Sequence, residues 1–543
     1  MLATEMRIGY IRFSLTPKPP PLMPETPSEE FASAAGTRPG GARAAGIASD
    51  ATFFGHPRGL STLFFTEMWE RFSYYGLRAI LILFMTATVA DGGLGFEVST
   101  AAAIVGVYTA AVYLMALPGG WIADRVIGQR RAVFLGGVII AAGHFSMAIP
   151  QLATFYLGLL LIVLGTGLLK PNISAMVGEL YPADAGARRD AGFSLFYMGI
   201  NLGAFLAPLI VGGLGEKVNW HLGFAMAGVG MVLGLIQYVL GGKYLGDAGL
   251  HPDATEVERA ANMRKLMIGL ALFAALIAAL IVFGVSVETI AGAGTAVIVG
   301  STVLYFAYVL IAGNLTREEK GRVGAIAVFF VAAAVFWAGF EQASTSFNLV
   351  AERLTNLNFF GWEMPASWLQ SANPFFIIAL APVFAWLWVW LSKRNAEPSS
   401  PRKFSGGLIL LGIGFLVIMV GTLQVASGSV TRMGVGWLVL TYLLHSCGEL
   451  ALSPVGLSTV TKLSPHRMVG QMMGIWFMAT SLGNLIAGLL AARIGAVDAA
   501  SAGAVSPDQA ASIFTFVAAV SIGAGLLLLV GGGIVKRMMG GVK

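Results

Sequence analysis

Apolar stretches about twenty residues long recur along most of the chain, separated by short polar segments. A helix needs about 20 apolar residues to cross the ~30 Å hydrocarbon core of a bilayer. Length and apolarity therefore predict an all-α, polytopic membrane protein with fourteen spans. These lie at residues 60–87, 101–123, 132–150, 153–177, 192–214, 220–241, 266–286, 292–312, 323–347, 372–392, 405–425, 435–460, 468–493 and 510–535.

The first span interrupts its apolar pattern with charges. It carries Glu67, Glu70, Arg71 and Arg78 before continuing as an apolar run to Met85. At about 100° per residue these charges share one face of a helix. A charge inside a membrane helix costs about 3 kcal/mol on insertion scales, so such charges usually mark an ion or substrate path. The alternative is a helix at the membrane interface whose charges snorkel to water, but Arg78 lies deeper along the run.

Basic residues of the loops collect on one side of the predicted membrane topology. Only Lys217, Arg353, Arg432 and Arg493 fall on the opposite side. By the positive-inside rule, both termini of this multi-pass protein are predicted to be cytoplasmic. The same rule explains the formal charge of +6, so no nucleic-acid partner is predicted.

Composition separates the chain from soluble proteins. It is 56% hydrophobic and 11% charged, whereas soluble domains carry about 25% charged residues. Its single cysteine, Cys447, can form neither an internal disulfide nor a zinc cluster. We expect no metal, redox group or other cofactor.

The spans divide the chain into four predicted regions. Residues 1–57 are rich in Pro, Ala, Gly and Ser, which predicts a disordered cytoplasmic tail. A first six-helix bundle follows at 58–243, then a cytoplasmic linker and an extra transmembrane hairpin at 244–322, and a second six-helix bundle at 323–543. Two such halves usually enclose a binding site near the membrane midplane.

Residues 119–131 join the second and third spans. They read GGWIADRVIGQRR and resemble the loop motif of the major facilitator superfamily, in which small residues allow close helix packing. A plain basic loop is the alternative. Either way, the segment identifies the scaffold rather than the substrate.

Residues 67–75, EMWERFSYY, resemble the first-helix ExxER motif of the proton-dependent oligopeptide transporter family, a branch of that superfamily. Further resemblances follow in order at 165–172, 196–204, 336–342, 370–374, 449–454 and 474–477. The extra hairpin resembles that of bacterial members. The resemblance implies a proton-coupled symporter that imports di- and tripeptides by alternating access in the inner membrane of a bacterium. We expect it not to be an enzyme and to function as a monomer in the lipid bilayer.

Candidate substrate groups make chemical sense independently of the resemblance. Peptides share an ammonium, a carboxylate and an amide, so a promiscuous site should hold the two ends. Arg71 and Lys170 offer cationic donors for a carboxylate. Glu449, Asn201 and Asn373 offer acceptors for an ammonium. The family resemblance implies the same roles at these positions.

The remaining predicted substrate-binding residues include aromatic side chains that could form adaptable walls with polar tips. The aromatic ones are Tyr74, Tyr75, Tyr113, Trp337 and Trp476, and the other two are Ser453 and Glu341.

Proton coupling is assigned to Glu67, Glu70, Arg71, Arg78 and Glu341. The resemblance implies that Glu341 takes the coupling proton and that Arg78 pairs with it when it is ionised. Vertebrate relatives use a histidine in the second span, and residues 101–123 contain none. We therefore expect carboxylates to carry the proton.

Each candidate also has a purely structural interpretation. Lys170 could simply pair with an intramembrane acid, and Asn201 and Asn373 could cross-link helices. The aromatics could be packing residues, as we expect of His144 and His445.

Three other functions compete with peptide transport: transport of another small anion such as nitrate, non-transporting nutrient sensing, and membrane-bound catalysis. The intramembrane acids and bases favour transport over sensing. No nucleophile–base pair or metal cluster in the sequence supports an enzyme.

Overall fold

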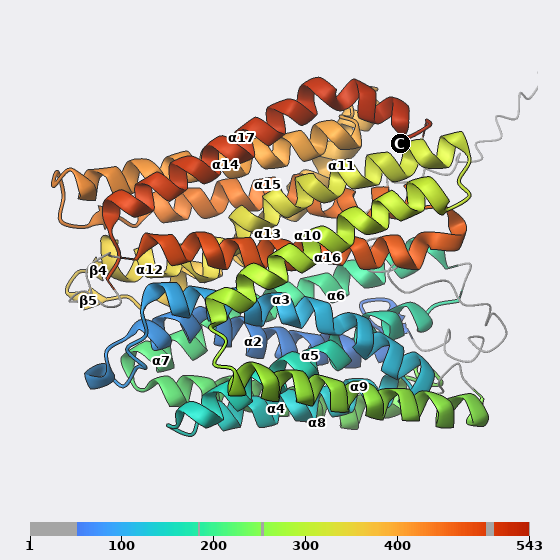
Figure 1. Cartoon of the computed structure of the whole chain (residues 1–543), viewed down its shortest axis with the longest axis horizontal. Coiled ribbons are helices and arrows are strands. Elements are labelled where there is room, and N and C mark those ends of the chain that lie inside the picture. The colour runs from blue at the N-terminus through green and yellow to red at the C-terminus, as the bar shows by residue number, and fades with distance from the viewer. Residues whose placement is uncertain (1–50, 183–184, 251–254, 496–503, 542–543) are drawn as a thin grey trace, which may run out of the picture.

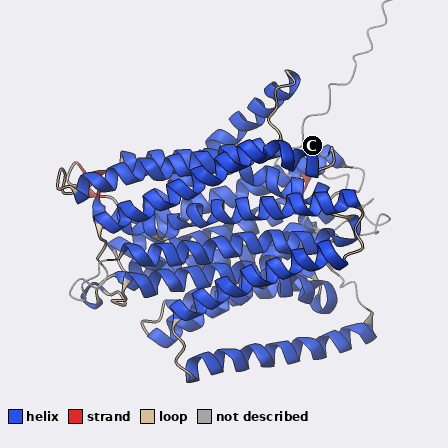
Figure 2. Cartoon of the chain, turned by 45° about the horizontal axis from the view of Figure 1, so that its top comes forward, coloured by secondary structure: helices blue, strands red, loops and turns tan. Residues whose placement is uncertain are grey.

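The computed structural model describes residues 51–182, 185–250, 255–495 and 504–541. Fourteen long helices run side by side in this part of the chain, and strands are confined to short segments (Figures 1 and 2). Twelve of them are long and apolar enough to cross a membrane. The other two, α2 and α4, contain charged residues within otherwise apolar sequence.

The first bundle contains six long helices. Its helices are α2 (Gly59–Thr86), α3 (Val98–Ile122), α4 (Gln129–Met147), α5 (Leu152–Glu179), α6 (Gly186–Ala207) and α8 (Trp220–Gly241).

The second bundle repeats the six-helix plan. Its helices are α11 (Arg317–Phe340), α13 (Ala372–Lys393), α14 (Ser400–Ala426), α15 (Gly436–Leu463), α16 (Val469–Ala491) and α17 (Pro507–Met538).

Between the bundles in sequence are α9 (Glu256–Val282) and α10 (Val287–Ala312). Figure 1 shows α10 running obliquely across the face where the bundles meet, and it contacts α3 of one bundle and α16 of the other. In the apolar part of α9 no residue is buried, so this helix presents its surface to lipid. The predicted extra hairpin is therefore present, with α10 packed and α9 peripheral.

Short elements gather at the loops. They are α7 (Gly213–Lys217), η6 (Glu341–Ser344), α12 (Ser346–Leu354), η7 (Ala366–Ser371), β3 (Thr355–Asn356), β4 (Asn358–Phe359), β5 (Trp362–Glu363) and β6 (Met433–Gly434). β3 pairs in parallel with β6, and β4 pairs antiparallel with β5. Figure 1 places β4, β5 and α12 at one end of the helices and the C-terminus at the other.

Residues 51–57 of the predicted disordered tail are structured. β1 (Ala51–Phe53) and β2 (His56–Pro57) form an antiparallel hairpin, and the His56 ring bonds the Tyr181 hydroxyl at 2.9 Å. His56 is buried against Tyr181, which follows α5 in the chain. This long-range contact holds the hairpin in place, and local composition could not predict it. The rest of the predicted tail lies outside the described residues.

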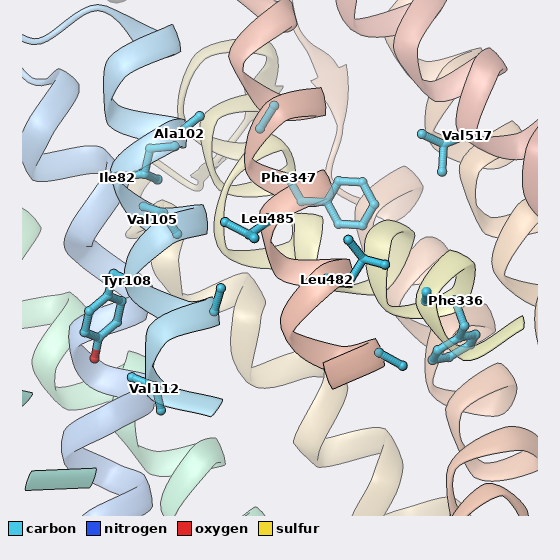
Figure 3. Close-up of a cluster of buried hydrophobic side chains, with 14 of the residues drawn as sticks. Ile82, Ala102, Val105, Tyr108, Val112, Phe336, Phe347, Leu482, Leu485 and Val517 are labelled. Atoms are coloured by element: carbon cyan, nitrogen blue, oxygen red, sulfur yellow. The ribbon is translucent and has the colours of Figure 1, made fainter. Parts of the chain in front are cut away.

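One apolar cluster crosses the boundary between the bundles. Figure 3 shows Ile82, Val105 and Tyr108 on one side and Leu485 and Phe347 on the other. Small residues let the backbones approach where the bundles touch, since a Cβ at Gly488 would lie 2.8 Å from the Ala102 carbonyl oxygen. The two bundles therefore meet through closely packed apolar side chains.

Candidate functional site

Helix α2 turns one polar face inward, as its sequence predicts. Glu67, Glu70 and Arg71 are each at most 3% exposed. The Arg71 guanidinium joins both carboxylates, with Nε 3.2 Å from Glu67 Oε1 and a shorter contact to Glu70. One oxygen of each glutamate receives no hydrogen bond from the described residues. Two acids and one base leave an excess negative charge with acceptor capacity to spare.

Two turns further along α2, Arg78 crosses to the second bundle. Its Nη2 lies 2.5 Å from Glu341 Oε2 and 2.7 Å from Ser344 Oγ. Glu341 begins η6, where α11 ends, so the ion pair joins the last third of α2 to a break in a helix of the other bundle. The structure thus brings together the pair that the family resemblance implied.

Tyr74 connects these two charged clusters. Its buried ring lies 5.0 Å from the Arg71 guanidinium carbon and 5.5 Å from that of Arg78, distances at which a ring face attracts a cation. Its neighbour Tyr75 packs edge-on at 5.3 Å. The ring keeps both arginines on one surface while its own hydroxyl bonds no described group.

Lys170 reaches the site from α5. Its Nζ lies 4.3 Å from the centroid of the Tyr113 ring on α3. Among the described residues no acid lies within ion-pair distance of Lys170, so the alternative of a purely structural ion pair is not supported. A cation held against an aromatic face remains available to an anion.

In the second bundle, Asn373 orients Glu449. The amide nitrogen of Asn373 on α13 donates to Glu449 Oε2 at 3.1 Å and to Ser446 Oγ at 2.9 Å, both on α15. Asn373 therefore cross-links helices and presents a carboxylate at the same time. Ser453 lies one turn after Glu449 on α15. Asn201 instead donates to the Tyr197 carbonyl on its own helix, so this bond does not support the alternative that Asn201 cross-links helices.

The two candidate tryptophans make packing contacts. Trp337 lies edge-on to Phe340 at 5.4 Å and faces Gly483 of α16, and Trp476 packs edge-on against Phe404 at 6.3 Å. His144 and His445 are likewise buried in helix contacts, as expected.

Sequence reasoning missed the polar contacts that fasten the bundles beyond Arg78. Asn348 Nδ2 donates to the Ala79 carbonyl at 2.6 Å. Glu216 accepts from the backbone nitrogens of Ala366 and Ser367 at 2.8 and 2.9 Å. Nothing in the local pattern marks these pairs, although Ser344 could have been found by its place one turn after Glu341. All lie toward the end of the molecule that carries α12.

Two six-helix bundles that meet around buried charged groups are the arrangement typical of secondary membrane transporters. Among the described residues no group of three or more His, Cys, Asp or Glu side chains could hold a metal ion. The chain belongs to the POT family, whose model matches residues 130–505.

Named relatives support this membership. The chain is 45% identical over 458 residues to the peptide transporter YePEPT of Yersinia enterocolitica, covering 82% of this chain and 89% of the relative. It is 41% identical over 451 residues to a di-/tripeptide transporter of Lactococcus lactis subsp. cremoris, covering 81% and 90%.

Solved structures agree. A crystal structure of the peptide transporter POT in complex with sulfate matches with a TM-score of 0.83 and 44% identity, covering 92% of this chain and 99% of that one. A POT family transporter in complex with 5-aminolevulinic acid matches with a TM-score of 0.80 and 35% identity, covering 89% and 98%. These comparisons confirm the predicted family, the predicted fold and the prediction of a transporter rather than an enzyme.

Proposed function

We propose that the protein imports di- and tripeptides together with protons by alternating access, as a monomer in a bacterial inner membrane with both termini cytoplasmic. Family membership and the peptide transporters among its relatives support the transport function. The observation that carries the mechanism is the buried ion pair between Arg78 and Glu341, which joins the two bundles beside the Glu67–Glu70–Arg71 cluster.

The two ends of a peptide meet opposite charges in the proposed site. Its carboxylate binds Arg71 and Lys170, and its ammonium binds Glu449, which Asn373 holds in place. A nitrate ion would use only the cations and would make no use of the Glu449 carboxylate, whereas a peptide would use both. The geometry therefore favours peptide over the anion alternative.

The balance of deep acids and bases leaves one negative charge that a proton can neutralise. The deep acids Glu67, Glu70, Glu341 and Glu449 outnumber the bases by one. A zwitterionic peptide adds no net charge, so one added proton makes the loaded site neutral. A neutral site lowers the free-energy cost of moving the peptide through a low-dielectric interior.

Glu341 is the proposed proton acceptor because its protonation breaks a bond between the bundles. With a neutral acid beside it, Arg78 loses the attraction that joins α2 to η6. The conformational equilibrium then shifts toward the state in which the two bundles separate at the end that carries α12. With the termini cytoplasmic, this end faces outward, so the structure corresponds to a state closed to the outside.

Uptake into proteoliposomes tests this function. The purified protein should accumulate a labelled dipeptide when the outside is acidic and should only equilibrate it without a proton gradient. Empty liposomes and labelled nitrate serve as controls. Gradient-driven uptake of nitrate with no uptake of dipeptide would contradict the proposal.

A further inference from the structure

A cavity of about 550 Å³ lies on the flank of the second bundle, among α10, α11, α16 and α17. Its floor includes Phe330 and Val517, which are buried. Its rim includes Val303, Val331 and Phe516, which are each more than half exposed. Because all four helices are membrane spans, the rim opens toward lipid rather than toward water.

One face of α11 links this cavity to a charge at the helix end. Ala327, Val331, Ala334 and Ala338 line the cavity, and their spacing from Lys320 follows the helical repeat, so all five share a face. Lys320 is exposed and forms no ion pair with a described residue. At about 1.5 Å per residue it lies roughly 10 Å from Ala327 and 16 Å from Val331. One leaflet of hydrocarbon is about 15 Å deep.

We propose that this cavity holds an acyl chain of an anionic phospholipid from the leaflet that borders Lys320. The headgroup lies beside Lys320, and the chain follows the α11 face into the cavity. Arg317 in the first turn of α11 and Arg537 in the last turn of α17 are also exposed at this end and add positive charge. The combination selects an anionic headgroup with a long apolar tail, since a zwitterionic lipid gains less from these cations.

Two hydroxyls in the cavity wall make it possible to distinguish an acyl chain from a polar ligand. Thr302 Oγ1 and Ser521 Oγ are buried and bond no described group. A hydrocarbon chain makes no use of them, whereas a polar small molecule would. Replacing Thr302 with the isosteric valine therefore leaves binding of an acyl chain unchanged.

The bound chain also contacts the helix end that carries the ion pair. Ala338 and Gly339 form part of the cavity wall, and Glu341 follows within the next turn. Leu482 of the wall adjoins Gly483, which packs on Trp337. The lipid therefore contacts α11 within one turn of Glu341.

Photo-crosslinking of the full-length protein in nanodiscs tests the site. The probes are phosphatidylglycerol and phosphatidylcholine with the same diazirine-bearing acyl chain, and labelled positions are mapped by peptide mass spectrometry. Label should concentrate on Val303, Val331 and Phe516, with phosphatidylglycerol about fivefold ahead, the factor that one lysine contributes near a charged lipid surface. Lys320→Gln should remove most of that preference.

Matched variants complete the test. Ala334→Phe should fill the cavity and abolish the concentrated label, whereas Ala275→Phe on the exposed face of α9 should leave it intact. Lys320→Gln lies at the surface and keeps the proposal testable if Ala334→Phe fails to fold. Label spread uniformly along the exposed faces of α9 and α10, with no excess at Val303, would mean bulk lipid only and would overturn the proposal. A loss of label in Thr302→Val, or a dimer that excludes the probe in native mass spectrometry, would also overturn it.

Discussion

Arg71 neutralises only one of the two glutamates beside it, and this imbalance sets the chemistry of the first bundle. The contacts to Glu67 and Glu70 are buried, where unpaired charge is costly. A proton or a ligand charge is therefore needed nearby. Lys170, held against Tyr113 without an acidic partner among the described residues, supplies the complementary cation.

Replacing Arg71 or Lys170 with alanine should weaken recognition of the peptide carboxylate by about 10- to 100-fold, the usual effect of losing a hydrogen bond to a charged group. Competition binding with a dipeptide and its C-terminal amide measures this. In wild type the amide should bind more weakly, and in each variant the two ligands should become nearly equal. Undiminished discrimination would show that these cations do not bind the carboxylate, and Lys170→Arg serves as a charge-retaining control.

For Glu449, substitution by glutamine keeps the shape of the side chain and removes its charge. Binding of a dipeptide with a free ammonium should fall by about tenfold or more, and binding of its N-acetylated form should change little. Isothermal titration with both ligands checks the difference. Equal losses for the two would rule out the ammonium role, and Glu363→Gln, in an exposed surface pair, should affect neither.

Residue-scale prediction succeeded where a helical repeat or a motif placed side chains. The shared face of Glu67, Arg71 and Arg78 follows from spacing on α2. The ion pair of Arg78 with Glu341 followed only from family resemblance, because its partners are 263 residues apart. The Glu216 contacts involve backbone nitrogens, which carry no sequence signature.

At the scale of elements, apolar length located helices well and their ends less well. The predicted span at 220–241 coincides with α8 (Trp220–Gly241). Helix α9 begins ten residues before its predicted span, at Glu256, where Thr255 and Glu258 form a capping box. Hydropathy reports the part of a helix inside the bilayer, so it cannot see the polar turns that extend into water.

Close helix contact between the bundles should be sensitive to side-chain volume. At Gly488 of α16 even a Cβ would lie 2.8 Å from the Ala102 carbonyl oxygen and 2.9 Å from Gly106 Cα. Gly488→Leu should therefore destabilise the protein by roughly 1–3 kcal/mol, as overpacking usually does, and lower its melting temperature in detergent. Gly523→Leu, on α17 with no atom within 4 Å of its Cβ position, should have little effect. Equal shifts for both would contradict the packing account.

At the scale of the whole molecule, polar contacts hold the bundles together at the α12 end. Glu216→Ala removes the acceptor for the backbone nitrogens of Ala366 and Ser367 and should favour separation there. In a Cys447→Ser background, Ser344→Cys should then react several-fold faster with a water-soluble maleimide. Glu363→Ala, in an exposed and weaker pair, is the control. Unchanged reactivity in Glu216→Ala would show that the contact does not limit opening.

The central claim is that protonation of Glu341 releases Arg78 and couples proton entry to peptide movement. Glu341→Gln mimics the protonated acid permanently, with little change in shape. It should abolish accumulation of dipeptide against its gradient and retain counterflow, which needs no net proton movement. Glu318→Gln, in an exposed pair at the start of α11, should behave as wild type in both assays.

Proteoliposome uptake of a labelled dipeptide by Glu341→Gln, driven by an inward proton gradient alone and compared with counterflow in the same vesicles, is the most direct measurement. The account predicts no concentrative uptake with counterflow preserved. Concentrative uptake by this variant would contradict it and would transfer the role of proton carrier to Glu67 or Glu70.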